Sequence, residues 1–285
     1  MSKKIDTRAV GLDVGLAFIR WLTGADNLHY GLWTGLEVTA GNLRAAQDAY
    51  TAKLFSYLSQ GPQRILDIGG GAGETAKKLL ALGHSVEIVV PSDFLAARCR
   101  INAPEARVHE CRLEDFSGSG PYDLCLFSES FQYIPLGASL PICERLLAPG
   151  GRILIADCFR SDSYRGRETH GPQPGGGHKL SAFRMAVSAS PFAIEAEEDI
   201  TNAVAPSIDL EQEFFSVLGH GVTRTSAALR ATRPFGHWAL VRLIGLFLSK
   251  NRQANLMQRL TGKTRSAEAF RAFNHYVILR LARRA

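Results

Sequence analysis

The residues of greatest chemical interest begin with the glycine loop Asp67–Gly73, which reads Asp-Ile-Gly-Gly-Gly-Ala-Gly. It follows a short apolar run and leads into a helical pattern that starts near Glu74. Because glycine has no Cβ, such a loop turns sharply and lets a ligand approach the backbone. In an open parallel sheet, ligands bind beyond the carboxyl ends of the strands. The loop therefore predicts a site for a nucleotide-like ligand, with close approach at Gly69, Gly71 and Gly73.

A dinucleotide is the main alternative ligand, because Gly71–Ala76 can be aligned with the pattern Gly-x-Gly-x-x-Ala. In that alignment the glycines should begin at the strand end, which Gly69 and Gly70 already occupy. Counted from Gly69, the sixth position is Glu74, which is unsuited to close helix packing and would repel a pyrophosphate. A neutral loop with acidic flanks suits a ligand that carries a sulfonium and an ammonium group. A tight turn without any ligand is the third interpretation.

Further candidate residues follow the next strongly apolar run, residues 122–127. Glu129 stands at the carboxyl end of this expected strand, where a desolvated glutamate has a raised pKa and acts as a base or an amine anchor. An acid at a helix N-terminus is the alternative interpretation. Gln132 and Tyr133 would line an acceptor pocket or pack beneath a lid. His178 follows three glycines, so it is either a base on a loop or a solvent-exposed histidine.

Length, composition and charge indicate a folded protein with a basic surface. The chain has 285 residues, of which 46% are hydrophobic and 21% are charged, which predicts a well-formed core. The formal net charge is +6, and much of the positive charge falls between Arg224 and Arg284. A basic surface attracts anions, nucleic acids or membranes. Since no motif of a known nucleic-acid-binding type is present, we expect a solvated face and no nucleic-acid partner.

The cysteines and apolar runs bear on the compartment. Five scattered cysteines without a Cys-x-x-Cys pair predict reduced thiols in a cytoplasmic protein, and no cluster has metal-ligand spacing, so no metal is expected. Residues 1–8 lack an apolar signal core. The apolar run 238–248 is too short to span a bilayer. With its basic flanks it would cover an apolar pocket, form a dimer contact or touch a membrane surface, and we favour the first.

The hydrophobic pattern changes near residue 60. Before it, helical spacing predicts helices over 8–23 and 40–59. After it, apolar runs alternate with helical stretches, which is typical of a parallel sheet covered on both faces. A loop over 160–179, rich in Gly and Pro, has a length that is usually functional. The expected strands cover 64–68, 85–90, 107–111, 122–127, 152–156, 193–200 and 274–281. The expected later helices cover 74–82, 94–102, 136–147 and most of a cap over 209–260.

The central part of the sequence resembles class I S-adenosylmethionine (SAM) dependent methyltransferases. Residues Leu66–Gly73 carry the family's acidic-x-Gly-x-Gly-x-Gly signature in full. Leu113–Phe116 precedes Tyr122–Leu124, and Leu146–Gly151 precedes the next strand, each at the family's interval. The resemblance covers residues 60–160, and it is specific because the order and the spacing of its short elements agree.

Two outer segments resemble small-molecule methyltransferases of the sterol, tocopherol, cyclopropane-mycolic-acid and macrolide type. His29–Trp33 is similar to their aromatic lid, and Glu129–Ile134 to their Glu-Ser-x-x-His-Ile segment. The resemblance implies an α/β fold with a Rossmann-like, mostly parallel seven-stranded sheet and helices on both faces. An N-terminal helical lid would occupy residues 1–60, the SAM-binding core 61–160, and a mobile loop, a helical cap insertion and the final strands 161–285. It also implies methyl transfer to a small, apolar or amphipathic acceptor, which would be lipid-like or a natural product. The methylated atom would be O, N or C.

The motifs and the resemblance together name the candidate site residues. The catalytic candidates are Glu129, Tyr133 and His178, and the substrate-binding candidates are Trp33, Gln132 and Tyr133. The cofactor-binding candidates are Tyr30, Asp67, Gly69, Gly71, Gly73, Pro91, Ser92, Leu113, Glu114 and Ser128, with Leu113 and Glu114 beside the adenine ring. Plainer roles stay open, since Asp67 would also cap the loop, and Tyr30 and Trp33 would also pack in a core.

Two positions depart from the family's pattern. Relatives carry an acid at the end of the second strand to hold the ribose hydroxyls, but that position falls here on Val89 or Val90. Ser92, Asp93 or backbone groups would have to substitute for it. Tyr133 stands where relatives often have histidine, which argues against a histidine base there. A SAM-fold binding protein without catalysis and a nicotinamide-dependent oxidoreductase therefore remain as alternatives, and the sequence leaves a monomer and a homodimer equally open.

Overall fold

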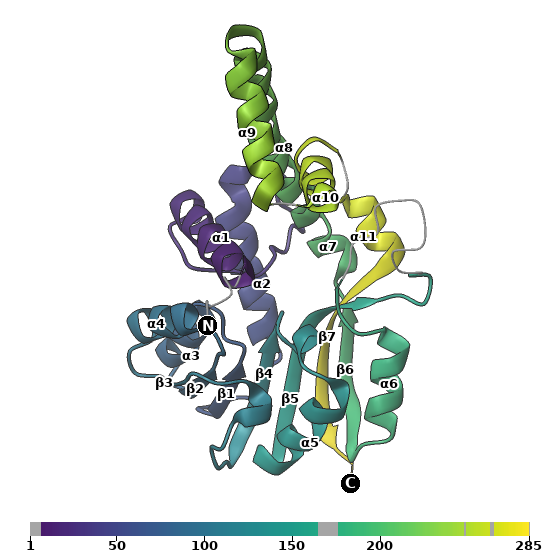
Figure 1. Ribbon diagram of the computed structural model, residues 1–285. Coiled ribbons are helices and arrows are strands. Elements are labelled where there is room, and N and C mark those ends of the chain that lie inside the picture. The colour runs from purple at the N-terminus through teal and green to yellow at the C-terminus, as the bar shows by residue number, and fades with distance from the viewer. Residues whose placement is uncertain (1–6, 165–175, 248, 263–264, 285) are drawn as a thin grey trace.

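A seven-stranded sheet organises the part of the chain that the computed structural model describes, residues 7–164, 176–247, 249–262 and 265–284 (Figure 1). The strand order is β3-β2-β1-β4-β5-β7-β6. The first five strands run parallel to their neighbours, whereas β7 runs antiparallel to β5 and β6. The expected Rossmann-like, mostly parallel sheet is confirmed. The strands are β1 Arg64–Ile68, β2 Ser85–Val89, β3 Arg107–His109, β4 Tyr122–Ser128, β5 Leu147–Arg160, β6 Phe192–Asp199 and β7 Asn274–Arg283.

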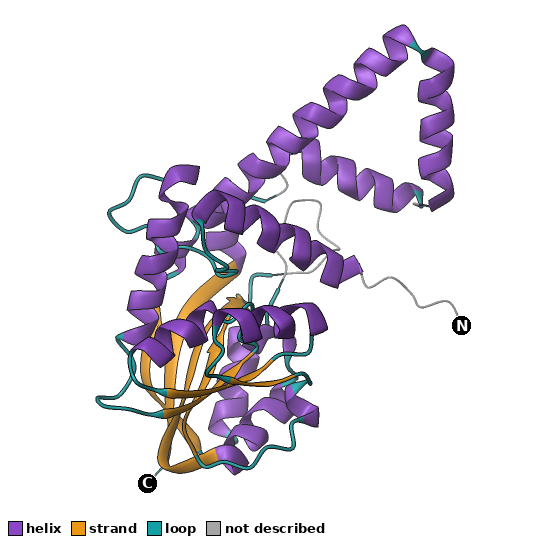
Figure 2. Ribbon diagram, turned by 90° about the vertical axis from the view of Figure 1, so that its left-hand side faces the viewer, coloured by secondary structure: helices purple, strands orange, loops and turns teal. Residues whose placement is uncertain are grey.

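Helices cover both faces of this sheet (Figures 1 and 2). Alternate side chains of β4 divide between two cores: Leu124 and Leu126 face one, and Cys125 and Phe127 face the other. Helices α2 Leu43–Phe55, α3 Glu74–Ala81, α4 Asp93–Asn102 and α11 Ala267–Phe273 pack into the first core, and α5 Leu136–Leu146 and α6 Leu180–Ser188 into the second. The remaining short elements and the first helix are α1 Thr7–Thr23, η1 Ala40–Asn42, η2 Leu113–Asp115, η3 Phe131–Tyr133 and α7 Thr201–Val204.

Several element boundaries differ from the sequence-based prediction. The helix expected over 40–59 divides into η1 and α2 and ends at Phe55, from which turns lead to Gly61 at φ 81°. The strand expected over 152–156 is longer, because β5 also includes residues 147–151, where the pairing with β4 shifts register between Tyr122 and Leu124. Helices α6 and α11 were not predicted, because each has fewer than ten residues and so gives only a short periodic pattern in the sequence. The middle of the expected loop 160–179 lies outside the described residues.

The helical part expected over 209–260 is present as three consecutive helices, α8 Pro206–Thr232, α9 Pro234–Phe247 and α10 Lys250–Thr261. The prediction that the run 238–248 covers an apolar pocket is wrong, because Trp238, Val241 and Leu243 are exposed and do not line the cavity described below. Only the first part of α8 contributes buried residues, which end at Gly219. A Cβ on Gly219 would lie 2.0 Å from the carbonyl oxygen of Leu260, so glycine permits the close approach of α10 to α8. The three helices stand away from the sheet as an arm (Figure 2).

The described residues contain neither a helix suited to cross a bilayer nor a cluster suited to bind a metal ion. No helix among them is long and apolar enough to cross a bilayer. No three His, Cys, Asp or Glu side chains of this part of the chain gather as a metal site. All five cysteines are free thiols, and four of them are buried.

Glycine at position 73 is expected to matter more for stability than glycine at position 83. Both flank α3 with φ of 87° and 85°, so alanine at either would cost about 1–2 kcal/mol for its left-handed backbone. A Cβ on Gly73 would lie 2.9 Å from the Cα of Cys99 in α4, whereas one on Gly83 would meet no atom within 4 Å. Gly73→Ala should therefore lower the free energy of unfolding by about 1–3 kcal/mol more than Gly83→Ala. Urea unfolding without SAM measures the stability of both variants. Equal decreases in the free energy of unfolding would show that α4 moves away from the added Cβ at no cost.

Candidate active site

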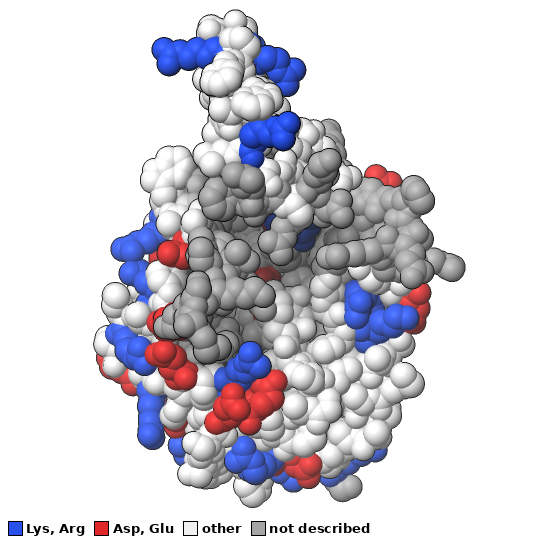
Figure 3. Space-filling model, viewed as in Figure 1, with Lys and Arg blue, Asp and Glu red and all other residues white. Residues whose placement is uncertain are grey.

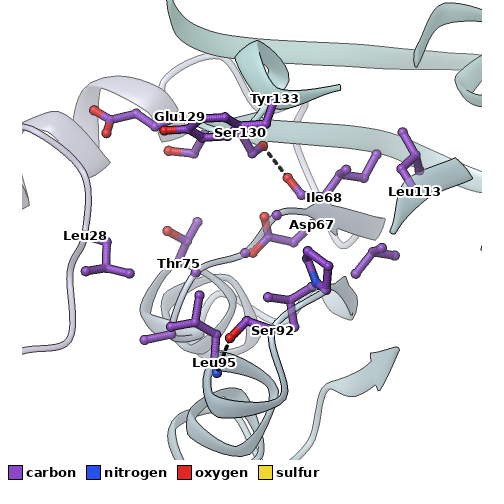
Figure 4. A pocket seen from close by; sticks show the side chains of 18 of the residues that line it. Leu28, Asp67, Ile68, Thr75, Ser92, Leu95, Leu113, Glu129, Ser130 and Tyr133 are labelled. Atoms are coloured by element: carbon purple, nitrogen blue, oxygen red, sulfur yellow. Dashed lines mark hydrogen bonds between the residues drawn. The ribbon is translucent and has the colours of Figure 1, made fainter. Parts of the chain in front are cut away.

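A cavity of about 880 Å³ opens beyond the carboxyl ends of β1, β2 and β4 (Figure 4). In Figure 4, Asp67 lies on its floor between Leu28 on one side and Leu113 on the other, with Glu129, Ser130 and Tyr133 on the wall opposite Ser92. This is the position that parallel sheets use for ligands. The predicted site residues that line the cavity are Asp67, Gly69, Gly71, Pro91, Ser92, Leu113, Glu114, Ser128, Glu129 and Tyr133.

The two predicted lid aromatics do not line this cavity. The Trp33 side chain is buried, and its indole N–H donates to Ser207 Oγ at 2.8 Å. The Tyr30 ring packs against Phe270 and Tyr276, with centroids 6.4 Å apart in each pair. The segment reaches the site through its backbone, because the Tyr30 N–H donates to a carboxylate of the cavity wall described below. Trp33 therefore connects the lid segment to α8, and Tyr30 packs it against the core.

Three other predicted residues also lie behind the cavity wall. Gly73 provides the close contact between α3 and α4. The Gln132 side chain donates to Asp157 Oδ1 at 2.9 Å, and its backbone N–H donates to Asp157 Oδ2 at 3.0 Å. His178 is half-buried, and its Nε2 donates to the carbonyl oxygen of Ile134 at 2.8 Å. His178 thus fastens the end of its loop onto the segment that carries Tyr133.

The glycine loop is stabilised by its own backbone hydrogen bonds. The N–H of Gly69 donates to the carbonyl of Val89 at 2.7 Å, and that of Gly71 donates to the carbonyl of Gly69 at 2.7 Å. The N–H of Gly73 donates to Gly70 at 2.9 Å. These three donors are therefore used within the fold, whereas a dinucleotide loop turns free N–H groups toward a pyrophosphate.

Asp67 is a buried carboxyl group of this site with an unpartnered oxygen. Its side chain is 1% exposed, and Oδ2 has no hydrogen-bond partner among the described residues. Burial raises the pKa of Asp67 to about 7. A buried carboxylate without a donor is costly, so the arrangement fits a ligand that brings a cation or N–H groups to this oxygen.

The cavity is acidic although the protein as a whole is basic. Seven carboxyl groups line it against one arginine, Arg112, among the described residues. His29 is neutral at physiological pH, because burial lowers its pKa to about 4. Asp26 is paired with Arg98, and burial favours the neutral form of Glu129, so the remaining carboxyl groups give the wall its negative charge. This charge favours a cation over a pyrophosphate. The carboxyl groups belong to Asp26, Asp67, Glu74, Asp93, Glu110, Glu114 and Glu129.

Glu129 lies in a buried chain of hydrogen bonds. Its φ of 56° is in the left-handed region, a strained conformation for a residue other than glycine. Oε1 accepts the N–H of Tyr30 and the hydroxyl of Tyr276, each at 2.8 Å. Tyr276 also contacts the hydroxyl of Tyr50 at 2.8 Å, and Tyr50 lies 3.3 Å from Ser128 Oγ. Burial raises the pKa of Glu129 to about 8, and the two donors oppose this shift only in part.

The carboxyl end of β2 offers no buried acid for a ribose. The side chains of Val89 and Val90 are buried at the position where relatives have one. Ser92 Oγ accepts the N–H of Leu95 at 3.3 Å and so serves as the N-cap of α4. The carboxylate of Asp93 is exposed at the rim of the cavity, and its Oδ1 accepts the N–H of Phe94 at 2.7 Å.

Sequence reasoning missed a polar pair that precedes the lid. Asp26 is buried, forms an ion pair with Arg98 and accepts a hydrogen bond from Asn102 at 2.7 Å. The Asn27 side chain is 2% exposed, and neither of its polar atoms has a hydrogen-bond partner among the described residues. Both line the cavity. The signal available was two adjacent polar residues directly before the aromatic segment, whereas nothing local marks Tyr50 or Tyr276.

Comparisons with known proteins agree with this geometry. Residues 66–155 match the family model described as a methyltransferase domain. The cyclopropane synthase MmaA2 from Mycobacterium tuberculosis shares the fold, with a TM-score of 0.68 and 17% identity over 99% of this chain and 100% of that one. The geranyl diphosphate C-methyltransferase from Streptomyces coelicolor A3(2) also shares the fold, with a TM-score of 0.63 and 17% identity over 94% of this chain and 92% of that one. The chain therefore has the fold of these methyltransferases, and residues 66–155 are similar in sequence to a methyltransferase domain.

The curated relatives are closer in sequence but match over a shorter length. The ubiquinone biosynthesis O-methyltransferase of Caulobacter sp. (strain K31) is 31% identical over 108 residues, which are 34% of this chain and 42% of that protein. The ribosomal RNA small subunit methyltransferase G of Rhodospirillum centenum is 32% identical over 112 residues, 38% of this chain and 50% of that protein. The chain thus spans half or less of the length of these curated relatives.

The raised pKa of Asp67 predicts a dependence of stability on pH. Asp67 titrates at its ordinary value of 3.8 when unfolded and at about 7 when folded, so stability without cofactor falls as pH rises between these values. Asp67→Asn removes this loss. As pH rises from about 4 to about 7, the free energy of unfolding of the variant should therefore increase by about 2–4 kcal/mol relative to that of the wild type. Urea unfolding across this range measures it, with the exposed Asp13→Asn as control. Parallel curves for the wild type and Asp67→Asn would contradict the burial of an unpaired carboxyl.

Proposed function

We propose that this chain is a SAM-dependent methyltransferase that acts on a small, apolar or amphipathic acceptor. The observation that carries the proposal is the acidic cavity at the glycine loop, with the buried and unpartnered Asp67 on its floor. SAM carries two positive groups, whereas a dinucleotide carries a pyrophosphate that this wall would repel. The free thiols support a location in the reducing cytoplasm.

The cavity residues divide into those that hold the cofactor and those that face the acceptor. Asp67 pairs with the ammonium end of SAM, Gly69 and Gly71 allow its close approach, and Leu113 lies beside the adenine ring. Asp93 at the rim takes the place of the missing ribose acid. When bound, SAM supplies a methyl group that is activated by a positive sulfur. The protein then contributes position and the exclusion of water.

Glu129 is the proposed base and acceptor anchor. With a pKa of about 8 it gains and loses a proton near physiological pH, as a general base must. Tyr276 and the Tyr30 N–H hold Oε1, so the carboxylate position depends on the lid being in place. The acceptor donates its proton to Glu129, and Tyr133 at the rim contacts the acceptor. His178 lies against Ile134 and keeps this wall in position.

The small acceptor is supported by the volume of the cavity. Its volume of about 880 Å³ lies within the range of small-molecule pockets. Solved structures that share the fold include a geranyl diphosphate C-methyltransferase, whose named acceptor is a small amphipathic molecule. O-, N- and C-methylation all fit a carboxylate base.

A second candidate function is SAM-fold binding without methyl transfer. The [4+2]-cyclase SpnF shares the fold with a TM-score of 0.67 and 14% identity over 97% of this chain, so the fold is compatible with another reaction. The absence of an acid at Val89 and Val90 favours this candidate. A methyl-transfer assay across acceptors separates the two.

Cofactor binding provides the first test. Titration calorimetry should show binding of SAM and no binding of NADH. Asp67→Asn should weaken SAM binding by about 10- to 100-fold, because a charge-assisted hydrogen bond is lost. Binding of NADH, or no binding of SAM, would overturn the proposal.

The role of Glu129 provides the second test. Glu129→Gln keeps an oxygen that can accept from Tyr30 and Tyr276, but it cannot take a proton. The variant should lose about 100-fold or more in kcat with little change in SAM affinity. In the wild type the rate should rise with pH through about 8, and this rise should disappear in the variant. S-adenosylhomocysteine release measures the rate, and the exposed Glu37→Gln serves as control. An unchanged pH profile in Glu129→Gln would rule out Glu129 as the base.

A further inference from the structure

The helical arm formed by residues 214–262 has little contact with the rest of the molecule (Figures 1 and 2). Helix α8 has 27 residues and so spans about 40 Å. After Gly219 none of its residues is buried, and α9 continues from its far end. The hydrogen bond between Ser226 Oγ and His237 Nε2, at 2.9 Å, ties α9 back to α8. The outer arm, residues 220–247, therefore has a surface that takes no part in the cavity.

The charge of the arm is of one sign. Residues 214–267 contain no Asp or Glu, although the chain has 27 of them, and contain nine Lys and Arg residues. Arg259 and Arg265 pair with Glu211 at the base of the arm. Figure 3 shows the outer arm with blue side chains and no red ones. The exposed arginines of the described outer arm are Arg224, Arg230, Arg233 and Arg242.

The arm also concentrates exposed apolar side chains. Of the seventeen large hydrophobic residues exposed in the described part of the chain, ten lie on it. A concentration of this kind on one element marks a surface that meets an apolar environment. The ten residues are Val217, Leu218, Val222, Phe235, Trp238, Leu240, Val241, Leu243, Leu256 and Met257.

Near the turn between α8 and α9, aromatic and basic groups combine. Phe235 is 78% exposed and Trp238 is 54% exposed, and their rings stack with centroids 5.7 Å apart. The guanidinium of Arg242 lies 5.4 Å from the Trp238 ring centroid. A tryptophan beside an arginine suits the bilayer interface, where the ring enters the headgroup layer and the cation meets phosphate.

We propose that the outer arm docks on the surface of an anionic lipid bilayer. Arginines without neighbouring acids are attracted to anionic headgroups, and the apolar residues between them enter the acyl boundary. Nucleic acid would use the arginines but leave the apolar side chains unused. A second copy of the arm would bring like charges together with no acid to pair them. This inference is independent of the proposed chemistry, since it needs neither SAM nor an acceptor.

Vesicle sedimentation of the full chain without SAM tests the docking. The wild type should bind vesicles of equimolar phosphatidylcholine and phosphatidylglycerol, bind pure phosphatidylcholine weakly, and release from the mixed vesicles as salt increases. Two arm variants should each lose about tenfold or more in binding. One is Phe235→Ser with Trp238→Ser. The other combines Arg224→Gln, Arg230→Gln, Arg233→Gln and Arg242→Gln.

Trp21→Ser provides the matched control, because Trp21 is 78% exposed on α1, outside the arm. It should bind mixed vesicles as the wild type does, and circular dichroism should show that all variants are folded. Brominated lipids give a local readout in Trp21→Phe, whose remaining tryptophans are the buried Trp33 and the arm residue Trp238. Quenching by mixed brominated vesicles is expected, and adding Trp238→Phe should abolish it.

Several outcomes would overturn the proposal. These are wild-type binding by both arm variants, equal loss in Trp21→Ser, or no quenching of Trp238. RNA binding without vesicle binding would assign the arm to nucleic acid, and a dimer lost in the arm variants would assign it to a second copy. SAM calorimetry on the arm variants keeps this test separate from the proposed function, since their cofactor affinity should equal that of the wild type.

Discussion

The close approach of two chain segments at the carboxyl ends of β1 and β4 is the constraint on which the site depends. The hydroxyl of Ser130 donates to the carbonyl of Ile68. A Cβ on Gly69 would lie 2.3 Å from the Cβ of Ser130, so only glycine allows this contact. The contact places Asp67 and Glu129, the two carboxyl groups to which we assign chemical roles, in one cavity. Loss of it would separate the cofactor side from the acceptor side.

Charge is segregated on this molecule. The chain is basic overall, yet the cavity wall is acidic and the arm carries no acid beyond Glu213. Burial strengthens the effect in the cavity, because low polarity raises the cost of each unpaired carboxylate and therefore the benefit of a cationic ligand. The same chain thus presents one surface suited to a cation and another suited to anions.

The lid links the cap to the catalytic wall. Ser207 at the start of α8 accepts from the backbone of Gly31 at 3.1 Å and from the Trp33 indole at 2.8 Å. One residue earlier, Tyr30 donates to Glu129. A shift of α8 would therefore move the backbone that holds the proposed base, which couples cap position to the state of Glu129.

The sequence by itself determined the order of the strands along the chain, the glycine loop and the cap helices. These features are local: glycine is needed where φ is positive, and apolar runs of strand length alternate with helical periodicity. It also placed Asp67 and Glu129 at strand ends, where a parallel sheet collects its ligand-binding groups.

Only the tertiary structure decided which side chains meet. Tyr276 binds Glu129 from 147 residues away, and Trp33 bonds to Ser207 from 174 residues away. No periodicity or motif encodes such partners, because they depend on how β7 and α8 return to the sheet. The same holds for Gln132 and His178, which the sequence suggested as pocket residues and which lie against Asp157 and Ile134. The unpaired state of Asp67 is likewise a property of its surroundings, since only the packed fold shows that no donor reaches its Oδ2 among the described residues.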